Sequence, residues 1–103
     1  MDMERWQQLS LAQQLGQVGS EISRGRHWEN KKDLASRQKA LARALDLLSL
    51  TLDDPRWVTR RRELARFQEV LASWYAQKET YQVLPDALEQ YCTALVVRSA
   101  RNI

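Results

Sequence analysis

The stretch LSLTLDDPRW, residues 48–57, decides the fold. It closes one apolar helical pattern and opens another, because proline suits the first position of a helix, where its missing N–H would have no intrahelical partner. The Asp54 side chain can accept hydrogen bonds from the unpaired amides at that start, and its charge suits the positive end of the helix dipole. Since so few residues separate the two patterns, we expect an antiparallel helical hairpin.

Working outward from this hairpin, apolar residues recur at three- and four-residue spacing, which predicts helices. The first runs from about Ser10 to about His27, with a capping box formed by Ser10 and Gln13, although it could begin earlier, near Asp2. The second follows Asp33 as its N-cap and ends near residue 52, and the third covers about 56–78. A loop over 77–82 and a fourth helix from 84–86 to about 98 complete the chain. The predicted fold class is all-α, an antiparallel up-down-up-down four-helix bundle forming one domain over residues 1–103.

The helices carry apolar stripes that should form the core. The stripe of the first is Leu11, Leu15, Val18 and Ile22, and that of the second is Leu34, Leu41, Leu45, Leu48 and Leu52. Gly16 and Gly19 lie beside the first stripe, which predicts a close approach of another backbone there; a frayed or kinked helix is the alternative. Four apolar residues outside the stripes or near helix ends are candidates for a protein interface, with capping of the bundle as the alternative for the tryptophans: Leu47, Leu50, Trp6 and Trp28.

Positive charge gathers in the middle of the chain. The 103 residues contain 16 Lys and Arg against 13 Asp and Glu, a net charge of +3, and residues 21–66 alone carry +5. One interpretation is a nucleic-acid-binding surface, and the alternative is ordinary solvated helix faces. Because consecutive helical residues point about 100° apart, residues 60–62 cannot form one flat patch. The candidate phosphate-binding residues are Arg24, Arg26, Lys31, Lys32, Arg60, Arg61 and Arg62.

Arg60 occupies an unusual position in the third helix. It falls within an apolar arc made by Trp57, Leu64, Phe67 and Leu71. An arginine there must extend its head to solvent or pair with a carboxylate. Glu21 and Glu29 are the plausible acids, and we expect a structural Arg60–Glu21 ion pair that fixes helix register.

The sequence offers little to a catalytic mechanism. It contains one histidine, His27, and one cysteine, Cys92. His27 is expected to interact with the dipole at a helix end, and Cys92 to be a small buried thiol on the fourth helix, rather than a base or a nucleophile. Metal sites need several ligands at suitable spacing, and the sequence has neither such a set nor a glycine-rich phosphate loop. We therefore expect no enzyme, no metal site and no cofactor.

Two segments, LGQVGSEISR at residues 15–24 and ARALDLLSLTLDDP at residues 42–55, carry a resemblance. Together they resemble a group of small all-helical bacterial proteins of unknown function, a resemblance that covers about the first two-thirds of the chain and implies a bacterial, cytoplasmic protein. At the level of fold, a small helical bundle is also similar to HEPN domains. The nuclease members of that group carry an arginine followed four to six residues later by a histidine. Residues 20–23, upstream of His27, are Ser, Glu, Ile and Ser, so that motif is absent.

These features predict a non-enzymatic bundle that acts through protein association, as a homodimer or an accessory subunit. The alternative is a nucleic-acid-binding protein that uses the basic region 24–66. The acidic start of the chain and the lack of a long apolar run predict a cytoplasmic protein with no membrane partner. The two hypotheses differ in what they require of the surface: exposed apolar residues for the first and clustered arginines for the second.

Overall fold

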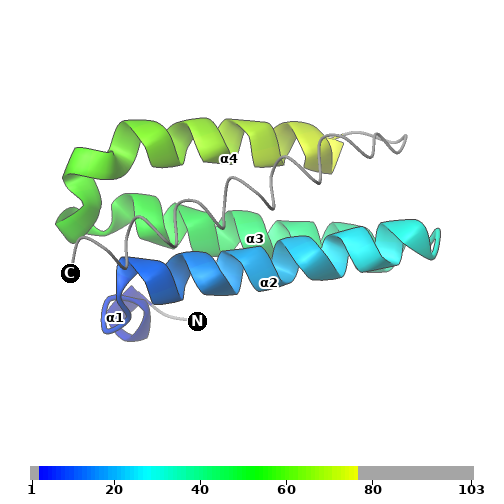
Figure 1. Ribbon diagram of the computed structural model, residues 1–103, viewed down its shortest axis with the longest axis horizontal. Helices are drawn as coiled ribbons and strands as arrows, with labels where there is room; N and C mark the ends of the chain where they lie inside the picture. Colours follow the sequence, from blue (N-terminus) through cyan, green and yellow to red (C-terminus); the bar gives the residue numbers. More distant parts are fainter. Residues whose placement is uncertain (1–2, 77–103) are drawn as a thin grey trace.

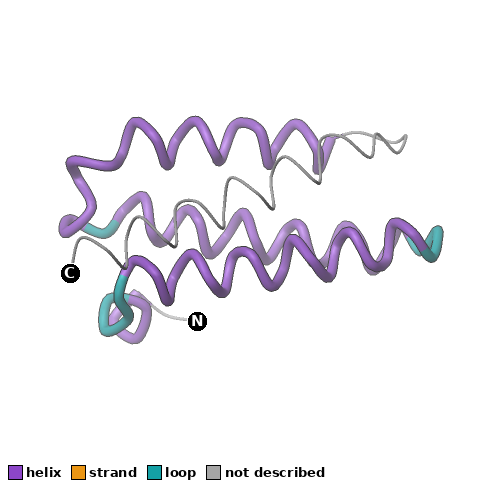
Figure 2. The backbone as a smooth tube through the Cα atoms, in the orientation of Figure 1, coloured by secondary structure: helices purple, strands orange, loops and turns teal. Residues whose placement is uncertain are grey.

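The computed structural model describes residues 3–76, and these form a helical bundle (Figure 1). The elements are α1 (Met3–Trp6), α2 (Leu11–Asn30), α3 (Leu34–Asp53), the 3₁₀ helix η1 (Pro55–Arg60) and α4 (Arg61–Ala76). The three long helices run antiparallel, and the short α1 folds against the start of α2 (Figure 2). Residues 3–76 contain no strand, so the predicted all-α antiparallel bundle is confirmed. The predicted loop over 77–82 and helix over 84–98 lie outside the described residues.

The predicted caps set the starts of α2 and α3. The Ser10 hydroxyl accepts from the Gln13 backbone N at 3.1 Å, and the Gln13 side chain accepts from the Ser10 N at 2.8 Å, which completes the capping box. Asp33 accepts from the backbone N and the hydroxyl of Ser36, and these bonds lower the pKa of its carboxyl. Lys32, with φ of 60°, turns the chain between the two helices. Local side-chain bonds therefore determine where both helices begin, as predicted.

The prediction of one continuous helix from residue 56 is wrong at its start. The Asp54 carboxylate accepts from the Arg56 backbone N at 3.0 Å, and the Trp57 N bonds to the Asp54 carbonyl three residues back, which is the 3₁₀ pattern. Trp57 itself has φ of −107° and ψ of 22°, outside the helical range. As a result Pro55–Arg60 forms the separate η1, and the α-helical pattern begins only at Arg61.

The core lies between α2, α3 and α4. The whole predicted stripe of α2 is buried, together with these residues of α3 and α4: Leu41, Ala44, Leu48, Leu64, Phe67, Leu71 and Trp74. Leu45 and Leu52 are only partly buried but pack against this cluster. Leu34 was expected in the core and is 52% exposed, because α3 begins at this residue, at the end of the bundle.

A close helix approach occurs at Gly25, which is neither of the two predicted glycines, and the close approach at Gly19 stays a prediction. A Cβ atom built on Gly25 would lie 2.7 Å from Cδ2 of Leu41, so α2 and α3 can pack this closely only because residue 25 has no side chain. A Cβ on Gly16 would meet nothing within 4 Å, and the predicted close approach at Gly16 is wrong.

Candidate functional site

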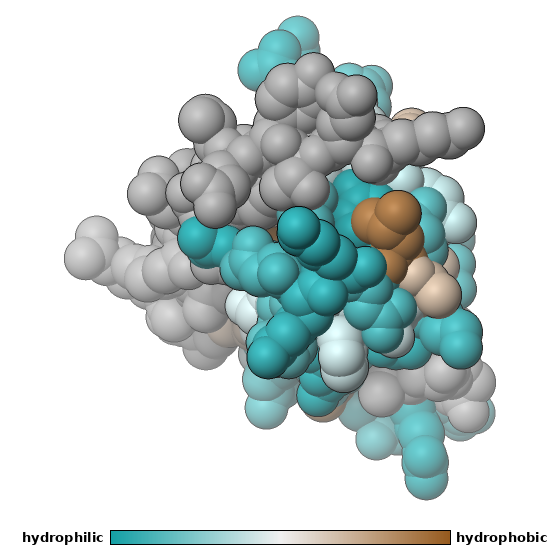
Figure 3. Space-filling model, turned by 90° about the vertical axis from the view of Figure 1, so that its right-hand side faces the viewer, coloured by the Kyte–Doolittle hydropathy of each residue, from teal (hydrophilic) through white to brown (hydrophobic). Residues whose placement is uncertain are grey.

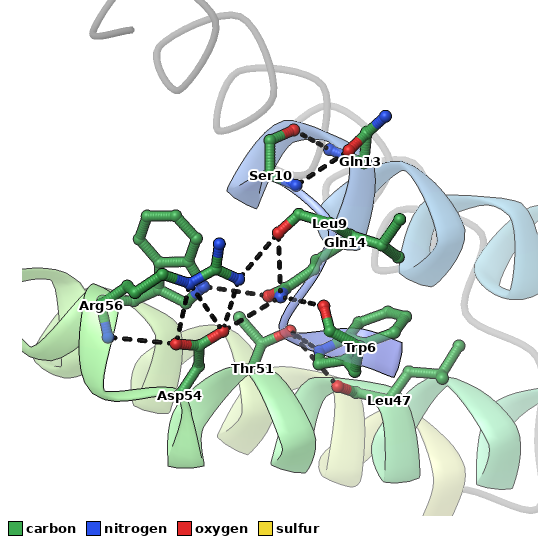
Figure 4. A network of polar contacts seen from close by, with 10 residues as sticks. Trp6, Leu9, Ser10, Gln13, Gln14, Leu47, Thr51, Asp54 and Arg56 are labelled. Atoms are coloured by element: carbon green, nitrogen blue, oxygen red, sulfur yellow. Dashed lines mark hydrogen bonds and ion pairs between the residues drawn. The ribbon is translucent and has the colours of Figure 1, made fainter. Parts of the chain in front are cut away.

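A buried hydrogen-bond network joins α1, α2 and η1 at one end of the bundle (Figure 4). Its centre is the fully buried Gln14, whose Nε2 donates to the Trp6 carbonyl at 2.9 Å and to Asp54 Oδ2 at 3.2 Å. The Gln14 Oε1 accepts from the indole N–H of Trp57 at 3.0 Å. The indole N–H of Trp6 donates to the Thr51 hydroxyl at 3.0 Å. Trp6 is fully buried, so the prediction that it belongs to a protein interface is wrong.

Asp54 is the charged member of this network. Burial raises the pKa of its carboxyl, but hydrogen bonds from the side chain and backbone of Arg56 and from Gln14 outweigh that effect and leave the pKa below its ordinary value. The bond to Asp54 also raises the pKa of Arg56, whose terminal nitrogen lies 2.7 Å from Asp54 Oδ2 and 2.7 Å from the Leu9 carbonyl. The side-chain groups of this network are satisfied within the chain, which indicates a structural role.

A second buried charged cluster lies at the opposite end of the bundle, where α2 passes into α3. Arg37, only 2% exposed, places its Nε 3.3 Å from Glu29 Oε1 and donates from Nη2 to the Trp74 carbonyl at 2.6 Å. Its guanidinium also lies 5.6 Å from the centre of the Trp74 ring. Gln38 donates to the Tyr75 carbonyl, so two α3 side chains bind the last turn of α4. This cluster was not predicted, although Arg37 lies between Leu34 and Leu41 in the apolar stripe, a position that indicates a buried arginine.

The acid predicted to pair with Arg60 has other partners. Glu21 is buried, and its Oε1 accepts from Arg24 while its Oε2 accepts from Arg43 Nε at 3.0 Å. Arg60 lies in η1 at the end of the bundle, whereas Glu21 lies midway along α2 (Figure 1). The predicted Arg60–Glu21 pair is therefore replaced by a bridge from α2 to α3 through Arg43.

The fold separates the basic residues that the sequence placed in one region. Lys31 and Lys32 lie in the turn between α2 and α3, and both are exposed. Figure 3 looks onto this end of the molecule, whose described surface is largely hydrophilic. Arg24 and Arg26 lie along α2, and Arg26 has an interaction partner. Arg60, Arg61 and Arg62 lie at the other end, at the junction of η1 and α4, so the described residues form two basic surfaces rather than one.

A cavity of about 470 Å³ opens at the junction of η1 and α4. Among the described residues it is lined by Thr59, Arg62, Glu63 and Arg66. Arg61 does not line it, in agreement with the expectation that three consecutive arginines point in different directions. The described lining combines two exposed guanidinium groups and a hydroxyl with one carboxylate, so it carries a net positive charge that favours an anion.

The outer face of α3 carries a regular stripe of mostly charged residues. At intervals of four, three, four and three residues stand Lys39, Arg43, Asp46, Leu50 and Asp53. The charged members are exposed and Leu50 is half-buried; Leu47, beside the stripe, is half-buried and packs against the core. The stripe is basic toward the start of the helix and acidic toward its end. We name it the α3 stripe.

The remaining predicted residues stay apart from these surfaces. Trp28 is half-buried and packs edge-on against the ring of the exposed His27, with ring centres 5.0 Å apart. Cys92 lies outside the described residues. Within residues 3–76 no three His, Cys, Asp or Glu side chains gather closely enough to hold a metal ion. None of the helices in that range combines the length and apolar character needed to cross a membrane.

Comparison with known proteins yields no relative: no protein family, curated protein or solved structure matches this chain. Function is therefore inferred from the geometry of the chain alone.

Proposed function

We propose that this protein is a non-enzymatic, cytoplasmic helical bundle that acts through protein association, by pairing with a second copy of itself through the α3 stripe. The observation that carries the proposal is the charge order of the stripe. Lys39 and Arg43 precede Asp46 and Asp53 along one helix face. Such a face is complementary to itself when two copies pack antiparallel, which is the requirement of an interface with two-fold symmetry.

The stripe defines one register for this pairing. The three- and four-residue spacing is that of a helix seam packed against another helix. In an antiparallel pair, each step forward along one helix is a step back along the other. With Arg43 opposite Asp46 of the second copy, Lys39 therefore faces Leu50 and Ser36 faces Asp53. The methylene groups of lysine can cover an apolar side chain while the ammonium group stays in water. Two Arg43–Asp46 pairs would then flank the symmetry axis.

Buried Glu21 supports the role of Arg43. Its carboxylate holds the Arg43 Nε at 3.0 Å, while the Arg43 side chain remains 53% exposed. An arginine restrained in this way loses less conformational freedom on binding than an unrestrained one. The guanidinium is therefore positioned for a carboxylate of the second copy.

The proposed interface is charged rather than broadly apolar. In residues 3–76 the exposed large apolar side chains are Leu34, which begins α3, and Val58 in η1, at opposite ends of the bundle. Stable dimers bury about 1,200–2,000 Å², more than one helix face provides, so we expect a weak dimer. Of the four predicted interface residues, Leu50 belongs to the stripe and Leu47 flanks it, while Trp28 stays a prediction.

Light scattering at a protein concentration of about 0.5 mM tests the proposal. The wild type should show a mass above the 12.1 kDa of one chain, approaching twice that value. Asp46→Arg should return the mass to that of a monomer, because it sets two arginines against each other in each pair. Glu69→Arg is the matched control, since it makes the same charge change at an exposed site on α4 and should leave the dimer intact.

Mixing two variants provides a stricter test of the register. Arg43→Asp alone and Asp46→Arg alone each place like charges together, so neither should dimerise. Mixed in equal amounts they should form a heterodimer, because both pairs become opposite in charge. Circular dichroism must show each variant folded. A wild type that is monomeric at this concentration, or a mixture that stays monomeric, would overturn the proposal.

A further inference from the structure

A second surface, at the junction of η1 and α4, has a different chemistry from the α3 stripe. Residues 56–66 contain five arginines and a single acidic residue, Glu63. Arg56 is bound to Asp54. Of the other four, Arg61, Arg62 and Arg66 are exposed and Arg60 is half-buried. This short segment is therefore the most basic part of the described surface.

The cavity of about 470 Å³ gives this surface a shape as well as a charge. Arg62 and Arg66, which both line it, are four residues apart on α4, so their Cβ atoms are about 5–6 Å apart on one side of the helix. Thr59 contributes a hydroxyl from η1. Glu63, the acidic residue of the lining, has an interaction partner of its own. Two guanidinium groups one turn apart can bind the oxygens of one tetrahedral anion, each through paired N–H donors.

We propose that this cavity binds a phosphate group of a nucleic-acid backbone. Arg60 and Arg61 lie outside the cavity lining, on the same η1–α4 segment. A ligand with a single phosphate would contact only Arg62 and Arg66, whereas a strand that carries successive phosphates would also use Arg60 and Arg61. A polymer of phosphates therefore fits the distribution of charge better than a free phosphate compound.

The recognition should not use base stacking. Base readout requires side chains that reach base edges or aromatic rings on which bases stack. No Trp, Tyr or Phe side chain in residues 3–76 is largely exposed. Contacts to the backbone phosphates then supply the affinity, and such affinity falls steeply with salt because counterions are released on binding.

Fluorescence anisotropy with a labelled DNA duplex of random sequence tests the proposal. If three phosphates are neutralised, one in the cavity and one each by Arg60 and Arg61, raising the salt from about 50 to about 200 mM should weaken wild-type binding about 40-fold, since the logarithmic slope is about −0.9 per phosphate. Arg62→Gln/Arg66→Gln removes the contact to the cavity phosphate and leaves two, so the same salt change should weaken its binding only about 12-fold. Lys31→Gln/Lys32→Gln removes equal charge at the opposite end of the bundle and should retain the wild-type salt dependence.

Three results would overturn the inference. The first is the absence of binding by the wild type at the lower salt concentration. The second is an equal change of salt dependence in the two double variants, which would indicate an effect of net charge alone. The third is binding of inorganic pyrophosphate as tight as that of the duplex, which would assign the cavity to a free phosphate compound. Because Gln replaces exposed residues in both variants, neither change should affect folding, and circular dichroism verifies this.

Discussion

Replacing Arg37 by methionine should strongly destabilise the bundle. The substitution keeps a long unbranched side chain in the core but removes the guanidinium that lies 3.3 Å from Glu29 and donates to the Trp74 carbonyl at 2.6 Å. Glu29 is only 5% exposed, so its carboxylate would remain buried without its cation. Loss of one partner from a buried ion pair lowers the free energy of unfolding by about 3–5 kcal/mol.

This loss would be a large part of the total stability. Domains are stable by only about 5–15 kcal/mol, and in one of this size each kcal/mol corresponds to about 4–8 °C in Tm. We therefore expect Tm to fall by at least about 12 °C, since the lower bound of the loss is about 3 kcal/mol. Urea unfolding monitored by circular dichroism measures the change in free energy directly. Lys31→Met, an exposed change in the turn between α2 and α3, is the matched control and should stay within about 0.5 kcal/mol of the wild type.

A double variant separates the lost charge pairing from the lost packing. Glu29→Met combined with Arg37→Met leaves no buried charge unpaired, so it should be more stable than Arg37→Met alone. The two single changes should consequently be non-additive, as expected for groups in direct contact. A cost of less than about 1 kcal/mol for Arg37→Met, or a double variant that shows the sum of the two single effects, would contradict a buried ion pair between Arg37 and Glu29.

Two further predictions concern helix packing and pH. Gly16→Ala should raise the free energy of unfolding by about 0.5–1 kcal/mol, because nothing lies within 4 Å of the added methyl group. Gly25→Ala should lower the free energy of unfolding, because its methyl group would lie 2.7 Å from the buried Leu41. Urea unfolding of both variants measures the two changes, and equal effects would contradict the prediction. Since the folded-state pKa of Asp54 lies below its ordinary value, the stability it contributes is fully present above about pH 5 and should be lost as the pH falls through that lowered pKa. Asp54→Asn should flatten this acid limb of the stability curve, and an unchanged curve would refute the role of Asp54.

The caps of α2, α3 and η1 could be predicted because their determinants are local, although the α-helical start at Arg61 could not. Ser10, Asp33 and Asp54 each bind backbone amides two or three residues ahead, so the sequence pattern alone indicates the bond. The apolar stripe of α2 was equally clear, since its period of three and four residues fixes one face. Both kinds of signal span at most a few turns of one helix.

The pairing of buried charges could not be predicted in the same way. Glu21 was expected to bind Arg60, but the packing of α2 against α3 brings Arg43 to it instead. Arg37 lies in the apolar stripe of α3, yet its partner Glu29 depends on how the turn at residues 31–33 aligns two helices. Such contacts depend on the relative register of the helices. Apolar periodicity does not determine this register, because the same apolar pattern recurs at every helical turn.

The buried polar clusters explain how the register is fixed. An apolar stripe would pack almost as well after a slide of one helical turn, whereas a hydrogen bond or ion pair between particular groups would be broken by it. Gln14 ties α2 to α1 and η1 at one end, and Arg37 ties α3 to α2 and α4 at the other. Burial of these groups contributes little net stability, so alignment of the helices is the physical reason to retain them. That alignment in turn sets Arg43 beside Glu21, so the position of the arginine in the α3 stripe depends on polar contacts inside the bundle.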